Sequence, residues 1–89
     1  MSFTLNLPSD FDTYATEVEA KGVFWDAFVY VDGRRVDVCF YDLDRLVDDM
    51  RAELAHQGVA VARRVLVLDR VIESAMRQAV ASADALFFA

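Results

Sequence analysis

The residues most able to carry chemistry lie in one short stretch, YDLDRLVDDM, which spans residues 41–50 and holds four aspartates. Hard cations bind where several carboxylate oxygens converge on one point. Asp44 and Asp48 are four residues apart and share a helix face, with Asp42 nearby. The stretch lacks the twelve-residue calcium loop, and a chain with one His and one Cys offers no paired ligands for zinc. The sequence therefore predicts no metal site and no cofactor.

Cys39 and His56 are the residues to consider for nucleophilic catalysis. A reactive thiolate needs a neighbouring base or cation. Cys39 is expected on a strand beside acids such as Asp26, which would raise the pKa of its thiol. His56 falls near a predicted helix end, where a cation complements the helix dipole. Acid–base catalysis by Asp26 and Asp37 would need one desolvated carboxyl in a cleft, which the pattern does not indicate. We therefore expect no enzymatic activity.

The first part of the chain predicts a short strand and then a helix. Residues 2–7 alternate apolar and polar side chains, which is typical of a half-buried strand. Pro8 to Asp10 have the composition of a helix start, and Gly22 can end the helix in the left-handed conformation. The residues between them show helical spacing of the apolar positions Phe11, Tyr14, Ala15 and Val18.

A β-hairpin is the strongest local signal. Asp32 and Gly33 form the two-residue pair that type I′ turns favour. Tight closure would pair Val31 with Arg34, Val29 with Val36, Ala27 with Val38 and Trp25 with Phe40. A four-residue loop would shift these partners by two positions and leave the faces unchanged. The predicted inner face comprises Trp25, Ala27, Val29, Val36, Val38 and Phe40. The predicted outer face comprises Phe24, Asp26, Phe28, Tyr30, Arg35, Asp37, Cys39 and Tyr41.

The second part of the chain predicts two further helices around a strand. Asp42 or Asp44 is a natural N-cap for a helix that Gly58 ends. Its apolar stripe, which we expect to face the core, consists of Leu43, Leu46, Val47, Met50 and Leu54. Residues 59–68 are rich in Val and predict a largely buried strand. Asp69 is expected to cap a third helix, and residues 85–89 predict an edge strand or a packed helix end.

The resulting order, β-α-β-β-α-β followed by a C-terminal helix, is the ferredoxin-like order. We therefore expect residues 1–89 to form a single α+β domain with an antiparallel sheet and helices on one face. The other face is either bare or covered by the C-terminal segment, and the pattern leaves both open.

Charge and composition bound the function. The net charge of −6, from 15 acids and 9 bases, disfavours nucleic acid as a partner. The N-terminal residues do not have the pattern of a signal peptide, and no apolar run approaches the ~20 residues of a membrane span. A single cysteine fits a reducing compartment, so we expect a cytoplasmic protein without membrane association.

The interleaved aromatic and acidic residues predict a protein-binding surface, because aromatic anchors with an acidic rim suit a basic partner. The interpretation is a small acidic binding protein, most concretely an immunity- or antitoxin-type inhibitor that masks a basic partner such as a toxin nuclease. The predicted partner-binding residues are Phe28, Tyr30, Asp37, Tyr41, Asp44, Asp48 and Asp49. Two alternatives stay open: the aspartates are only the solvated, dipole-matched side of a helix, or the protein is a homodimer whose bare sheet face meets its own copy.

Overall fold

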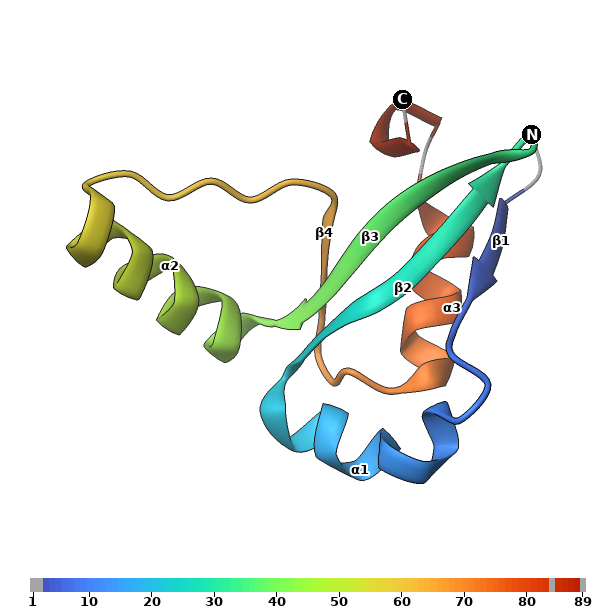
Figure 1. The fold of residues 1–89 in the computed structure, drawn as a ribbon, viewed down its shortest axis with the longest axis horizontal. Coiled ribbons are helices and arrows are strands. Elements are labelled where there is room, and N and C mark those ends of the chain that lie inside the picture. Colours follow the sequence, from blue (N-terminus) through green and yellow to red (C-terminus); the bar gives the residue numbers. More distant parts are fainter. Residues whose placement is uncertain (1–2, 84, 89) are drawn as a thin grey trace.

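The computed structural model describes residues 3–83 and 85–88 of the chain (Figure 1). The α+β class predicted from the sequence is confirmed. The elements are, in chain order, β1 (Phe3–Asn6), α1 (Phe11–Lys21), β2 (Val23–Val31), β3 (Arg34–Asp42), α2 (Leu43–Gln57), β4 (Val65–Leu68), α3 (Glu73–Ser82) and the 3₁₀ helix η1 (Ala85–Phe88).

The four strands form one mixed sheet in the order β1-β2-β3-β4. β1 and β3 each pair antiparallel with β2, whereas β4 lies parallel to β3. The predicted ferredoxin-like antiparallel sheet is therefore wrong. The difference is that β4 pairs directly with β3 at the edge of the sheet and not with β1. The connection through α2 returns the chain to the start of the neighbouring strand, so this pair is parallel.

The hairpin closes tightly, as predicted, but one extra residue interrupts its register. Val31 pairs with Arg34 at the turn, and Asp32 and Gly33 both have positive φ, as a type I′ turn requires. Farther along, Phe24 pairs with Phe40 in place of Trp25, because the register shifts between Phe24 and Ala27.

This β-bulge exchanges two large side chains between the faces of the sheet. Phe24 was predicted outside and is buried against the Phe11 ring, with 5.2 Å between centroids. Trp25 was predicted inside and is 58% exposed. An extra residue in one strand reverses the in–out alternation beyond it, which is why the alternating pattern gave the wrong face for both residues.

The core lies between one face of the sheet and the helices α1 and α3, with η1 at its edge (Figure 1). Val29 and Phe40 at the centre of the sheet are fully buried, as are Met76 of α3 and Phe88 of η1. The Phe88 ring stacks at a tilt on Phe3, with 4.7 Å between centroids. The C-terminal segment thus covers the core face, and the tail prediction of a packed helix end is confirmed.

Helix α2 does not join this core. Its 15 residues, all of them described, include none that is buried. In Figure 1 the helix projects from the end of β3 as an arm, and residues 58–64 return beside it to β4. The prediction that its apolar stripe faces the core is wrong, because the chain turns away from the sheet at Leu43, which is 60% exposed.

Two further predictions in the second half need correction. Residues 59–68 form a strand only from Val65, because Arg64 adopts a φ of 51° and interrupts the extended chain. Val59 and Val61 are consequently exposed and not part of a buried strand. Asp69 does not cap α3, whose N-cap is Ile72 without a side-chain hydrogen bond.

Candidate functional site

Asp42 caps the root of α2 and also bonds it to the end of α1. Asp42 is the N-cap of α2, and its Oδ1 accepts a hydrogen bond of 2.8 Å from the Arg45 backbone N–H. The Asp42 backbone N–H donates to the Gly22 carbonyl at 2.8 Å. Gly22 ends α1 in the left-handed conformation, with φ of 73°. These contacts fix where the arm begins, and hence where its side chains lie relative to the sheet.

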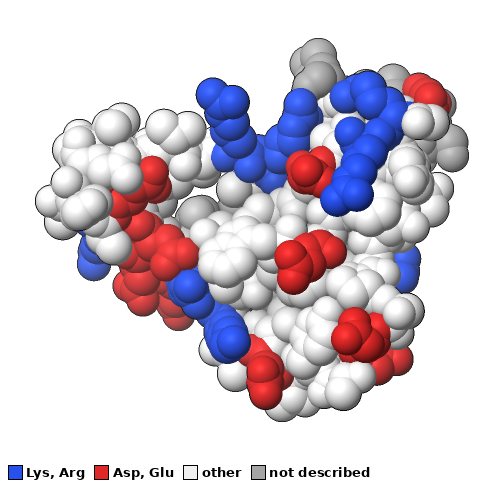
Figure 2. Space-filling model, in the orientation of Figure 1, with Lys and Arg blue, Asp and Glu red and all other residues white. Residues whose placement is uncertain are grey.

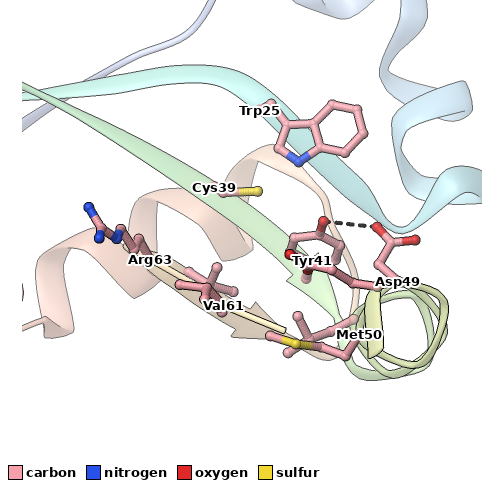
Figure 3. Close-up of a pocket in the computed structure, with 11 residues that line it drawn as sticks. Trp25, Cys39, Tyr41, Asp49, Met50, Val61 and Arg63 are labelled. Carbon is pink, nitrogen blue, oxygen red and sulfur yellow. Dashed lines mark hydrogen bonds between the residues drawn. The ribbon is translucent and has the colours of Figure 1, made fainter. Parts of the chain in front are cut away.

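A cleft of about 220 Å³ lies where α2, β3 and the returning segment meet (Figure 3). One part of its wall carries the aromatic rings of Trp25 and Tyr41. The carboxylates of Asp49 and Glu53 line it from α2. The remaining lining residues are Cys39, Leu46, Met50, Val61, Ala62, Arg63 and Val65.

Asp49 joins the sheet to the arm. The Tyr41 hydroxyl donates to Asp49 Oδ2 at 2.9 Å, and Arg45 Nε donates to Asp49 Oδ1 at 2.9 Å. Partial burial acts to raise the pKa of the Asp49 carboxyl, but the hydrogen bonds from Arg45 and Tyr41 outweigh it and hold that pKa below its usual value. Asp49 is therefore an ionised structural group between α2 and β3.

Arg45 lines a neighbouring depression and connects the start of α2 with the end of α1. Its Nη1 donates to the Lys21 carbonyl at 3.1 Å, and its guanidinium carbon is 6.0 Å from the Trp25 ring centroid. The Arg45 side chain pairs with Asp49, and within the described residues it forms no ion pair with Asp44 or Asp48.

Cys39 has the properties of an inert thiol. Burial, and secondly the negative charge of Asp49, raise the pKa of Cys39 from its ordinary value of 9.0 to about 12. The predicted direction is thus confirmed, although the acidic neighbour is Asp49 and not Asp26. His56 is exposed near the far end of α2. A thiol so far from ionisation gives no support to nucleophilic catalysis.

The sheet face opposite the core carries the other predicted hairpin residues. Tyr30 is 45% exposed and its ring meets the Phe28 ring edge-on at 5.2 Å. The Arg35 guanidinium stacks over Phe28 at 4.1 Å, and Arg35 Nε pairs with Asp37 Oδ1 at 2.9 Å. This group lies toward the hairpin turn, away from the cleft, and the carboxylate of Asp37 is paired with Arg35.

The structure therefore divides the predicted site residues. Tyr41 and Asp49 come together at the cleft but are bonded to each other, and Tyr41 is only 9% exposed. Asp44 and Asp48 are exposed on the arm, and neither forms an ion pair within the part of the chain that the structure describes. Phe28, Tyr30 and Asp37 form a separate cluster.

Sequence reasoning missed two residues of the cleft. Trp25 was assigned to the core, and no feature of the sequence marks the bulge that exposes it. Glu53 was overlooked, although its position one helical turn after Asp49 places both carboxylates on neighbouring parts of one face. Figure 2 shows a group of acidic side chains along α2, further acidic side chains on the rest of this face, and several basic side chains along its upper edge.

Among the described residues, no group of three or more His, Cys, Asp or Glu side chains is placed to hold a metal ion. None of the described helices is long and apolar enough to cross a membrane. Comparisons with protein-family models, with curated proteins and with solved structures found no match to this chain.

Proposed function

We propose that this protein is an acidic binding protein that takes a basic protein partner at the cleft between α2 and β3. The observation that carries the proposal is the combination at one cleft of an exposed tryptophan, Trp25, with the carboxylate of Glu53, which forms no ion pair within the described residues. Exposed Trp is among the residues most enriched at the energetic centres of protein interfaces. A lysine or arginine side chain can place its charge near a carboxylate and its stem against an indole ring.

The electrostatics of the arm favour a cationic ligand. Glu53, Asp44 and Asp48 have no ion-pair partner in the described residues, whereas Asp49 is paired with Arg45. Exposed carboxylates on a projecting helix steer a basic surface toward the cleft and raise its association rate.

The most specific form of the proposal is an immunity- or antitoxin-type inhibitor. Such a protein acts by covering a basic functional surface of its partner, and it needs no cofactor or reactive group of its own. The inert thiol of Cys39 and the paired state of Asp49 agree with a binding role, because both groups are held in one protonation state near neutral pH.

The test is capture of partners from a lysate of the source organism, with two single variants beside the wild-type chain. Trp25→Ala removes the anchor, and Asp48→Lys reverses a charge that lies outside the cleft. We expect the wild type to retain one basic protein, Trp25→Ala to lose it, and Asp48→Lys to bind it more weakly. The Asp48→Lys effect should shrink at high salt, since the screening length falls from about 10 Å at 0.1 M to about 3 Å at 1 M. Equal capture by Trp25→Ala, or capture of no basic protein, would contradict the proposal.

A further inference from the structure

One side of α2, next to the cleft and sharing Met50 with it, carries an apolar seam that the rest of the described chain covers only in part. Leu43, Val47, Met50 and Leu54 follow one another at intervals of four, three and four residues, the spacing of the two core positions of a heptad repeat. Leu43 and Leu54 are 60% and 50% exposed, and the two central residues are only half-buried. The seam is regular, and the described chain covers it only in part, at Val47 and Met50.

A helix of this kind needs a packing partner. Isolated helices of about 12–15 residues are marginal in water, and most helical stability in proteins comes from packing of an apolar face. Helix α2 has 15 residues, none of them buried, and one side-chain cap at Asp42. Val59 and Val61 on the returning segment add exposed apolar surface to the same arm.

The residues beside the seam identify the partner as a second copy of the helix. If two α2 helices pack antiparallel about a two-fold axis, Leu43 lies opposite Leu54 of the second copy and Val47 lies opposite Met50. On one flank of the seam, Asp44 then faces Arg51 of the second copy, offset by two residues, or about 3 Å, along the helix axis. The two-fold axis repeats this contact, so the pairing creates two ion pairs of opposite charge.

Both charges are available for that contact. Neither Asp44 nor Arg51 forms an ion pair within the described residues, although both are exposed. In a parallel pair the flank with Leu46 and Glu53 would instead face the flank with Asp44 and Arg51 of the second copy, so Asp44 would face no basic residue. The charge pattern therefore favours the antiparallel arrangement.

We propose that the protein forms a two-fold symmetric dimer in which the α2 arms pack antiparallel through Leu43, Val47, Met50 and Leu54. The cleft lies on a neighbouring face of the same helix and shares Met50 with the seam, so the dimer would carry one cleft at each side of the helix pair. The inference does not depend on the proposed function. It differs from a dimer formed through the bare sheet face, because the sheet takes no part in the helix pair.

The test is the solution mass of the purified full chain over a range of concentrations, by sedimentation equilibrium. The wild type should approach twice its 10.0 kDa mass as concentration rises. Leu54→Glu places a carboxylate in the seam twice per dimer and should raise the dissociation constant roughly 100-fold or more. Ala52→Glu adds the same charge at an exposed position on the side of α2 opposite the seam and should leave the mass nearly unchanged.

A charge-exchange pair tests the orientation. Asp44→Arg should weaken the dimer about tenfold by setting two arginines against each other, and Asp44→Arg with Arg51→Asp should restore it. A wild-type chain that stays monomeric, or a Leu54→Glu variant that still dimerises, would overturn the proposal. Dimerisation lost in Leu54→Glu without rescue in the exchange pair would overturn the antiparallel arrangement. Partner capture by a monomeric Leu54→Glu variant would show that the cleft acts without the dimer.

Discussion

Replacement of Gly22 by alanine tests how the arm is fixed to the body. Gly22 has a φ of 73°, and an added Cβ would lie 2.6 Å from Cγ of Asp42. The left-handed conformation costs a residue with a Cβ about 1–2 kcal/mol. Displacement of the Asp42 side chain would also cost the α2 cap, which is worth about 1 kcal/mol. We expect Gly22→Ala to lower the free energy of unfolding by about 2–3 kcal/mol.

Gly58 provides a matched control for this substitution. It ends α2 in the same conformation, with φ of 76°, and a Cβ there would meet nothing within 4 Å. Gly58→Ala should therefore cost only the backbone strain, about 1–2 kcal/mol at most. The difference between the two variants, about 1 kcal/mol, measures the contact with Asp42 and the cap it holds.

Urea unfolding at a fixed protein concentration measures both variants, with the slope of the transition checked for constancy. A second control repeats Gly22→Ala in an Asp42→Ala background, where the carboxylate that blocks the Cβ is absent. There the substitution should cost only the strain, so the two changes should be non-additive by about 1 kcal/mol. Equal costs for Gly22→Ala and Gly58→Ala, or full additivity with Asp42→Ala, would refute the reasoning.

Two further predictions follow from the titratable groups near the cleft. Because the pKa of Cys39 rises from 9.0 to about 12, its thiolate fraction near neutral pH is roughly a thousandth of that in the unfolded chain, and alkylation by iodoacetamide should be slower in proportion. A folded rate within tenfold of the urea-denatured rate would contradict this. Asp49→Asn should cost about 1 kcal/mol near neutral pH, a value reduced from that of a buried charged hydrogen bond because Asp49 is partly exposed. Since the folded pKa of Asp49 lies below its usual 3.8, its contribution is present above that pH and is lost as the pH falls through the folded pKa. The gap between the urea midpoints of the variant and the wild type should therefore narrow in acid, and a gap independent of pH would argue against this assignment.

Local signals in the sequence correctly predicted the hairpin turn and the ends of two helices. Asp32 and Gly33 predicted the hairpin and its register at the turn, because the backbone conformation there depends on those two residues alone. Gly22 and Gly58 marked the ends of α1 and α2 for the same reason. The bulge near Trp25 was not predictable, because both alternating faces of that strand contain large apolar residues and either register satisfies the pattern.

The packing of α2 was predicted wrongly, and the cause of this error also explains why the cleft was not predicted. An apolar stripe indicates that one face of a helix is buried, but it does not indicate which surface covers that face. The stripe was assigned to this chain's own sheet, whereas α1 and α3 already cover the core face. The cleft follows from the projecting arm, so Trp25 and Glu53 could not be joined to it before the arm was placed.

The pattern of α2 is best explained by a contact outside the chain. None of the buried core residues belongs to this helix, so the core imposes no requirement on Leu43, Val47, Met50 and Leu54. The cap at Asp42 and the pair of Arg45 with Asp49 hold the helix in place, but together they contribute only about 1–2 kcal/mol. A helix supported so weakly would gain little from a regular apolar seam that faced water, since exposed apolar surface of this extent favours association. We therefore infer that a second chain buries the seam. The solution masses of Leu54→Glu and Ala52→Glu decide whether that second chain is another copy of this protein.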